Sequence, residues 1–183
     1  MKIGIYGSGE IKLQDNTAKK ARDLGRKIAE MGHTIITGGC SGFSYEAVLG
    51  AHKVGGKCIA YSPAKDLKTH KQYNMPTEGF SEFVFVPFNY NHINNKSVCL
   101  KYRNVSSVAD IDAAIIIGGR VGTMNEFTIA YDMGKNIGIL DETGGITKNA
   151  IRALLRDANK PSNSKIVWDK NPISLVQRLT NME

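Results

Sequence analysis

The segment from Ala113 to Glu126 constrains the fold of this chain more than any other. Its first five residues, Ala-Ala-Ile-Ile-Ile, are all apolar and predict a buried strand. Gly118-Gly119-Arg-Val-Gly122 follows directly, and Thr123 then opens a helical pattern. A strand, a glycine turn and a helix in succession direct free backbone amides and the positive end of a helix dipole at one point. The segment therefore predicts an anion site, with the Glu126 carboxylate about one helical turn further on.

The same residues also have a purely structural interpretation. Thr123 and Glu126 have the spacing of a capping box, in which the two side chains satisfy the free amides of a helix N-terminus. Local spacing does not choose between the two interpretations, and Thr123 is able to cap a helix and contact a phosphate at once.

Two more strands of the predicted fold end in glycine turns. Ile3 to Tyr6 runs into Gly7-Ser8-Gly9, and His33 to Thr37 runs into Gly38-Gly39-Cys40-Ser41-Gly42. Neither these turns nor the first contains G-x-G-x-x-G or a P-loop, so the sequence predicts neither a dinucleotide site nor an ATPase. Because parallel strands end at one edge of a sheet, the three turns together predict a site for a phosphate-bearing ligand.

Strands alternate with helices along the whole chain of 183 residues. This alternation predicts one α/β domain, residues 1–183, with a Rossmann-like, doubly wound, mostly parallel sheet of about seven strands and helices on both faces. The expected strands are 3–6, 33–37, 57–61, 82–87, 111–117, 137–140 and 165–168. The expected helices are 14–31, a segment ending near Gly55, 91–108, 123–134, 147–158 and 172–179. The polar, lysine-bearing segment 64–79 is expected to be a loop or lid.

Composition narrows the class of protein. Three scattered cysteines (Cys40, Cys58 and Cys99) indicate reduced thiols and a cytoplasmic protein, and no apolar stretch is long enough to span a membrane. Cys40 lies in the second glycine turn, where it is either a pocket residue or, more simply, a small buried filler. The four histidines lack metal-ligand spacing, so no metal site is expected. The formal charge of +7 suits acidic ligands, with nucleic acid as a secondary candidate.

Gly118 to Glu126 resembles the G-G-x-G-T-x-x-E signature of the Lonely Guy (LOG) proteins, with one extra residue between the second and third glycines. The superfamily includes proteins labelled "possible lysine decarboxylase", a label that the chemistry does not support because no lysine here lies in a recognisable pyridoxal-phosphate motif. The resemblance covers most of the chain. Gly7-Ser8 and the segment 37–42 resemble the first two family turns, and Tyr102-Arg103-Asn104 resembles the segment with the essential arginine.

The resemblance implies hydrolysis of the N-glycosidic bond of a nucleoside 5′-monophosphate to a free base and ribose 5-phosphate. It implies Arg103 and Glu126 as the catalytic pair, no cofactor, and a homodimer. It also implies ligand-binding roles for the turn residues: Gly118, Gly119, Gly122 and Thr123 for the phosphate, and Gly39, Ser41 and Ser8 for the nucleotide pocket.

Elementary chemistry agrees with these roles. Cleavage builds positive charge on the ribose. The Glu126 carboxylate would either stabilise that charge or orient the attacking water. Arg103 stays protonated and serves as an electrostatic anchor. Without the resemblance, a surface ion pair from Arg103 to Asp110 or Asp112 would be the simpler interpretation.

Four residues depart from the LOG pattern: Ile117 replaces proline, Cys40 replaces glycine, Asn104 replaces lysine and Glu46 replaces a small residue. The departures point to a neighbouring branch, and such branches include molybdenum-cofactor carriers. The second hypothesis is therefore a non-catalytic carrier of a nucleotide or a molybdopterin-type phosphate ligand.

Overall fold

The computed structural model describes residues 1–9, 16–158 and 160–182 and contains one seven-stranded sheet. All neighbouring strands pair in parallel, in the order β4-β3-β2-β1-β5-β6-β7. Their bounds are β1 Lys2–Gly7, β2 Thr34–Thr37, β3 Cys58–Tyr61, β4 Glu82–Val84, β5 Ala113–Ile117, β6 Asn136–Leu140 and β7 Ile166–Asp169. The sheet order reverses between β1 and β5, which is where open α/β sheets bind ligands.

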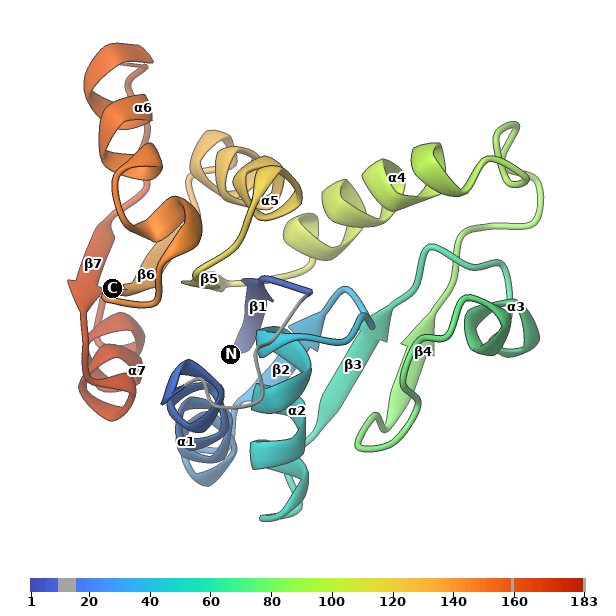
Figure 1. The fold of residues 1–183 in the computed structure, drawn as a ribbon, viewed down its shortest axis with the longest axis horizontal. Helices are drawn as coiled ribbons and strands as arrows, with labels where there is room; N and C mark the ends of the chain where they lie inside the picture. Colours follow the sequence, from blue (N-terminus) through green and yellow to red (C-terminus); the bar gives the residue numbers. More distant parts are fainter. Residues whose placement is uncertain (10–15, 159, 183) are drawn as a thin grey trace.

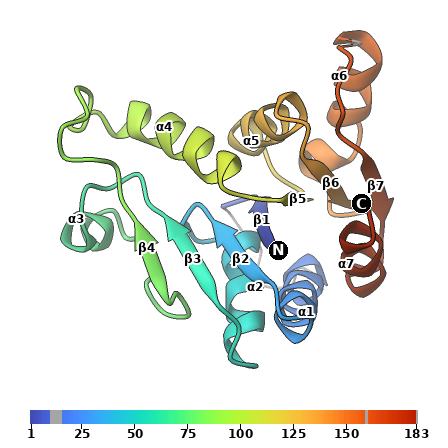
Figure 2. The same cartoon turned by 180° about the vertical axis from the view of Figure 1, so that it is seen from behind.

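Helices cover both faces of the sheet, as the alternating pattern predicts (Figures 1 and 2). One face carries α1 (Asn16–Glu30), α2 (Phe43–His52) and α7 (Pro172–Thr180). The other carries α4 (Lys96–Ala109), α5 (Val121–Asp132) and α6 (Ala150–Ala158). Alternate residues of the central strands enter the two cores: Ile115 and Ile117 pack toward α1 and α2, whereas Ile116 packs toward α4 and α5.

The segment 64–79 is not a plain loop, which corrects the expectation from sequence. It contains the short helix α3 (Leu67–Gln72), whose N-cap Asp66 accepts a hydrogen bond from the Thr69 amide at 2.7 Å. His70 is fully buried, with Nδ1 2.8 Å from Ser62 Oγ and Nε2 3.0 Å from the Pro76 carbonyl oxygen. The bond to Ser62 fastens the segment to the end of β3, and the bond to Pro76 closes the segment on itself; the polar composition gives no sign of either.

Other differences concern the ends of elements. The helix expected at 91–108 begins only at Lys96, because the Asn95 side chain accepts from the Val98 amide and caps it. The strand expected at 82–87 ends at Val84, and the helix expected from 147 begins at Ala150 after the 3₁₀ turn η1 (Gly145–Thr147). The expected start of the first helix near Gln14 lies outside the described residues.

Glu46, one of the departures from the LOG pattern, has a structural explanation. Its carboxylate pairs with Arg22 and so links α2 to α1. These two helices approach closely: a Cβ on Gly50 would lie 2.0 Å from the Arg22 carbonyl oxygen. The Glu46–Arg22 pair is thus part of a tight helix contact.

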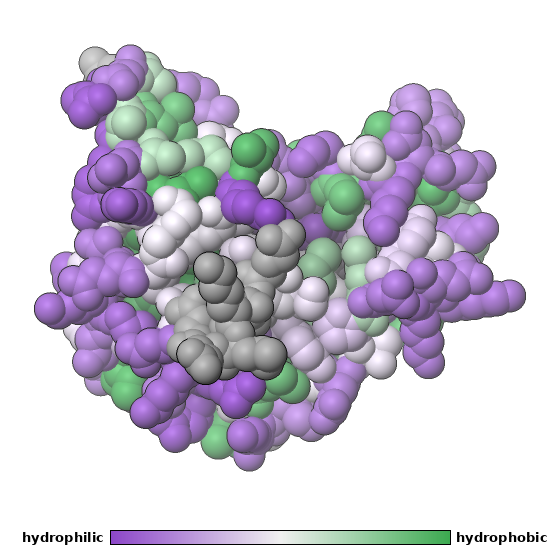
Figure 3. Space-filling view, in the orientation of Figure 1, coloured by the Kyte–Doolittle hydropathy of each residue, from purple (hydrophilic) through white to green (hydrophobic). Residues whose placement is uncertain are grey.

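No helix in the described part of the chain is long and apolar enough to cross a membrane. On the face shown in the space-filling view, hydrophilic residues cover much of the area and hydrophobic residues gather over α6 (Figure 3).

Candidate functional site

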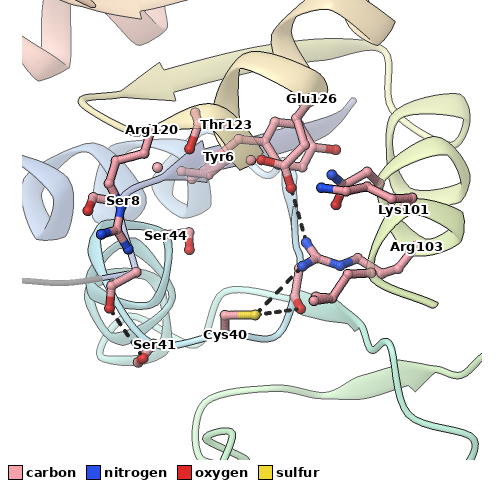
Figure 4. A pocket seen from close by; sticks show the side chains of 17 residues that line it. Tyr6, Ser8, Cys40, Ser41, Ser44, Lys101, Arg103, Arg120, Thr123 and Glu126 are labelled. Carbon is pink, nitrogen blue, oxygen red and sulfur yellow. Dashed lines mark hydrogen bonds and ion pairs between the residues drawn. The ribbon is translucent and has the colours of Figure 1, made fainter. Parts of the chain in front are cut away.

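The three glycine turns lie side by side, because the strands that precede them, β2, β1 and β5, are neighbours in the sheet. A cleft of about 320 Å³ opens at this edge, between the turns and α4 (Figure 4). Its lining includes six of the residues predicted from sequence: Ser8, Ser41, Arg103, Gly122, Thr123 and Glu126. The tertiary structure thus brings together side chains that are up to 118 positions apart, counting from Ser8 to Glu126.

Arg103 and Glu126 form an ion pair in this cleft. Arg103 Nη1 lies 3.0 Å from Glu126 Oε1, and the two side chains are only 8% and 9% exposed. Arg103 comes from α4 and Glu126 from α5, and both point toward the same space (Figure 4). The alternative of a surface pair with Asp110 or Asp112 is wrong: Asp110 binds Lys2 and Tyr61, and Asp112 accepts from the Lys2 amide.

Burial changes the acidity of the carboxylate. Loss of solvation raises the pKa of Glu126 from 4.5 to about 7, although the nearby positive charges of Arg103 and Lys101 oppose the shift. A buried carboxyl group with a pKa near neutrality is suited to acid–base and electrostatic work at physiological pH.

The Arg103 side chain can occupy its position only because residue 38 is a glycine. A Cβ on Gly38, at the end of β2, would lie 1.7 Å from Arg103 Nη1 and 2.5 Å from Cζ. The guanidinium group therefore occupies space that any other residue at position 38 would fill. Cys40, two residues further along the same turn, is half-buried and lines the cleft. Its Sγ atom lies 3.7 Å from Arg103 Nη2. Of the two roles considered for Cys40, the structure supports the pocket residue.

The capping-box interpretation of Thr123 and Glu126 is wrong. Helix α5 begins at Val121 with Arg120 as its N-cap, so Thr123 already lies in the first turn and Glu126 in the second. The amides of 121–123 have no acceptor inside the helix, and Gly122 and Thr123 line the cleft. The start of α5 two residues earlier than expected leaves Glu126 available to Arg103.

Three of the predicted binding glycines shape the turns and do not line the cleft. Gly39, Gly118 and Gly119 have φ angles of 65°, 56° and 94°, which other residues adopt only with strain. The Gly39 amide donates to Thr37 Oγ1 and the Gly118 amide donates to Thr143 Oγ1. The Gly118 amide, expected to hold the phosphate, and the Gly39 amide, expected in the nucleotide pocket, are thus each bonded within the protein, and the ligand-binding roles of these glycines stay a prediction.

Five polar residues of the cleft received no site role from the sequence: Tyr6, Ser44, Lys101, Asn104 and Arg120. Lys101 and Arg120 extend from opposite sides of the cleft, with Arg120 near Ser8 and Lys101 near Glu126 (Figure 4). Asn104 Nδ2 donates to Asn125 Oδ1 at 2.9 Å, and with the amide rotated by 180° the same nitrogen would instead donate to Glu126 Oε1 at 3.2 Å. In the sequence, Asn104 stands out only because it replaces the lysine that is usual at this position in the LOG proteins.

The cleft offers no obvious metal site. Among the residues that the structure describes, no group of three His, Cys, Asp or Glu side chains is arranged to hold a metal ion. The chemistry available is that of a buried carboxylate, an arginine and backbone amides.

Comparison with known proteins agrees with the fold and the motifs. The sequence model of the SLOG cluster4 family, part of the LOG-like superfamily, matches residues 1–176. An uncharacterized protein from Archaeoglobus fulgidus is 33% identical over 141 residues, which cover 76% of this chain and 80% of the relative.

Solved structures share the whole fold at low sequence identity. The X-ray structure of TM1055 superposes with a TM-score of 0.80 at 21% identity and covers 99% of both chains. The molybdenum cofactor binding protein from the phototrophic bacterium Rippkaea orientalis superposes with a TM-score of 0.75 at 23% identity, over 99% of this chain and 96% of that one.

Proposed function

This chain belongs to the SLOG cluster4 family, and from that premise we propose that it is a nucleoside 5′-monophosphate phosphoribohydrolase, with residues 1–183 acting as one nucleotide-binding domain. The proposed reaction cleaves the N-glycosidic bond and yields a free base and ribose 5-phosphate. The observation that carries the proposal is the buried Arg103–Glu126 pair beside three glycine turns.

The proposed chemistry follows from the position of Glu126. As the bond from ribose to base breaks, positive charge develops on the sugar, and a nearby carboxylate stabilises it electrostatically or orients the attacking water. Burial makes this interaction stronger than it is in water, because the local dielectric constant is low. Arg103 holds Glu126 in place through Nη1 and presents fixed positive charge to the ligand.

The phosphate has a separate role, which is positioning. Gly122 and Thr123, in the first turn of α5, line the cleft, where free first-turn amides and the helix dipole favour an anion. Lys101 and Arg120 add positive charge on the two sides. Binding energy from this remote group then helps to orient the sugar against Glu126.

The test is chromatographic detection of free base after incubation with a panel of nucleoside 5′-monophosphates. The wild-type protein should release base from at least one member, and Glu126→Gln should lower the rate by about 10²–10⁴-fold. Glu30→Gln, at an exposed position of α1, is the matched control and should retain full activity. Base release that survives in Glu126→Gln contradicts the mechanism.

A second candidate function is a non-catalytic carrier of a phosphorylated pterin or nucleotide. Its support is the fold shared with a molybdenum cofactor binding protein together with the altered cleft residues Cys40 and Asn104. This function predicts tight binding of a phosphorylated ligand without base release from any nucleotide of the panel. Failure to bind any phosphate-bearing ligand contradicts both candidates.

We further propose that the protein is a homodimer formed through α4 and α5. Val121 is 83% exposed and Val105 is 47% exposed, and both lie on these two helices. Exposed apolar side chains favour an interface at these helices. Because the same helices carry Arg103 and Glu126, the proposed interface would lie close to the cleft.

A further inference from the structure

The glycine turn after β5 is held from behind by the segment 141–147, which follows β6 and ends with the 3₁₀ turn η1. Thr143 Oγ1 accepts a hydrogen bond from the Gly118 amide at 2.8 Å. The Ile146 amide donates to the Gly119 carbonyl oxygen at 3.1 Å. Two successive residues of the turn are thus each hydrogen-bonded to the segment 141–147.

The same segment and the turn also pack backbone against backbone. A Cβ on Gly145 would lie 2.2 Å from the Gly119 carbonyl oxygen, and a Cβ on Gly118 would lie 2.9 Å from the Thr143 carbonyl oxygen. Glu142 has a φ angle of 59°, which is uncommon for a residue with a side chain and costs free energy. Such strain persists where the surrounding structure fixes the conformation, so the segment is held in one arrangement against the turn.

The hydroxyl group of Thr143 is used entirely within the protein. It donates to the Leu140 carbonyl oxygen at 2.6 Å while it accepts from the Gly118 amide. Thr143 is buried and is not one of the residues that line the cleft. It can therefore affect a ligand in the cleft only through the turn that it holds.

Gly119 connects the position of this turn to the N-terminus of α5. A Cβ on Gly119 would lie 2.5 Å from Thr123 Cβ and 2.6 Å from Thr123 Oγ1, so the two residues are in close contact. Thr123 is buried in the first turn of α5 and lines the cleft, where first-turn amides and the helix dipole favour an anion. A shift of the turn would displace these groups from their position against the anion.

We propose that Thr143 is a positioning residue of the anion site: its hydroxyl holds the Gly118–Gly119 turn so that Thr123 and the first turn of α5 face a phosphate group in the cleft. The proposal rests on the function proposed above only in placing a phosphate-bearing ligand at this turn. The phosphoribohydrolase and the carrier both meet that condition.

The test measures phosphate binding directly, by calorimetry with ribose 5-phosphate. Thr143→Val removes the hydroxyl but keeps the branched shape of the side chain, and it leaves the Gly118 amide without its partner. The affinity for ribose 5-phosphate should fall by about tenfold. Thr143→Ser, which retains the hydroxyl, should restore most of the affinity.

Thr147→Val is the matched control for a purely structural effect. Thr147 is a fully buried threonine of the same segment, and its hydroxyl donates to the Gly144 carbonyl oxygen at 2.7 Å instead of to the turn. Both valine variants should lower the urea midpoint, because each leaves a buried carbonyl oxygen without its donor. Only Thr143→Val should also weaken ribose 5-phosphate binding.

A second pair of variants moves the turn without touching Thr143. Gly145→Ala places a methyl group against the Gly119 carbonyl oxygen and should weaken ribose 5-phosphate binding. Gly144→Ala introduces a side chain at a similar positive φ angle, 74° against 56°, but has nothing within 4 Å of the new Cβ and should leave the affinity unchanged. If Thr143→Val does not fold, this pair decides, and equal affinities of the two alanine variants overturn the proposal.

The possible results separate this proposal from the proposed function. Unchanged binding of ribose 5-phosphate by Thr143→Val overturns the positioning role, as does an equal loss of affinity in Thr147→Val. Absence of ribose 5-phosphate binding by the wild-type protein overturns it too. A selective loss in Thr143→Val, in a protein that releases base from no nucleotide, supports the positioning role and contradicts the phosphoribohydrolase.

Discussion

Arg103 Nη1 lies 3.0 Å from Glu126 Oε1, and the pair is buried between α4 and α5 at the edge of the sheet. Removing either partner from such a pair leaves an uncompensated buried charge, whereas the intact pair holds two reactive groups in one geometry. The cleft thus contains a carboxylate whose charge depends on pH near neutrality and whose orientation depends on one arginine. Four predictions follow from this relationship and from the surface around it.

Gly38→Ala should displace Arg103. The new Cβ would lie 1.7 Å from Arg103 Nη1, so the guanidinium group has to move away from Glu126. We expect base release to fall by about tenfold or more, with destabilisation of about 1–3 kcal/mol from overpacking. Activity assays and urea unfolding measure the two effects. In an Arg103→Ala background the same substitution should cost little stability, and an equal cost in both backgrounds would show that the clash lies elsewhere.

The stability of the protein should fall as pH rises from about 4.5 to about 7 because of Glu126. Its pKa is raised in the folded state, so the folded protein binds more protons than the unfolded chain in this range. The contribution is fully present below the unfolded pKa and is lost as pH rises through the folded pKa. Its size is on the order of 1–3 kcal/mol. Urea midpoints across this range, with Glu126→Gln as the comparison, isolate the effect, and identical pH dependence in both proteins would contradict it.

The rate of base release should rise as pH increases through about 7, the pKa of Glu126. Stabilisation of a positively charged sugar requires the ionised carboxylate, which is the minor form below that pH. Initial rates at nucleotide concentrations well below KM, which report kcat/KM and hence the pKa of the free protein, give the profile across the neutral range. A rate that falls over the same range would instead indicate that protonated Glu126 acts as a general acid.

Val121→Asp should dissociate the proposed dimer. The side chain is 83% exposed at the start of α5, and a charge there has to lose its water when the helices of two copies pack together. Sedimentation velocity should show a dimer for the wild-type protein and a monomer for the variant. Ile173→Asp, at a 39% exposed position of α7 on the opposite face of the sheet, is the matched control and should leave the dimer intact. A wild-type monomer contradicts the proposal.

The fold class was predictable from sequence because its signals are local. Continuous apolar runs such as 113–117 mark strands buried on both faces, and glycines at their ends mark the turns. Because the strands alternate with helices, they are expected to pair in parallel, with the helices covering the two faces of the sheet. The Gly134 end of α5 was also predicted, and its amide donates to the Tyr131 carbonyl oxygen in a Schellman motif. The start of α4 was missed because it depends on the Asn95 side-chain cap, and the start of α5 was missed because its N-cap Arg120 makes no side-chain capping hydrogen bond that its residue type would announce.

The candidate site was likewise predictable from sequence only in part. Residue type and spacing alone pointed to the glycine turns and Glu126, whereas Arg103 joined them only through the resemblance to the LOG proteins. Only the tertiary structure decided that Arg103 faces Glu126 through the space left by Gly38, that Lys101 and Arg120 flank the cleft, and that Thr143 holds the Gly118 amide. The reason is physical: spacing fixes the conformation of adjacent residues, whereas burial, pKa and the contacts of distant side chains depend on how the strands and helices pack.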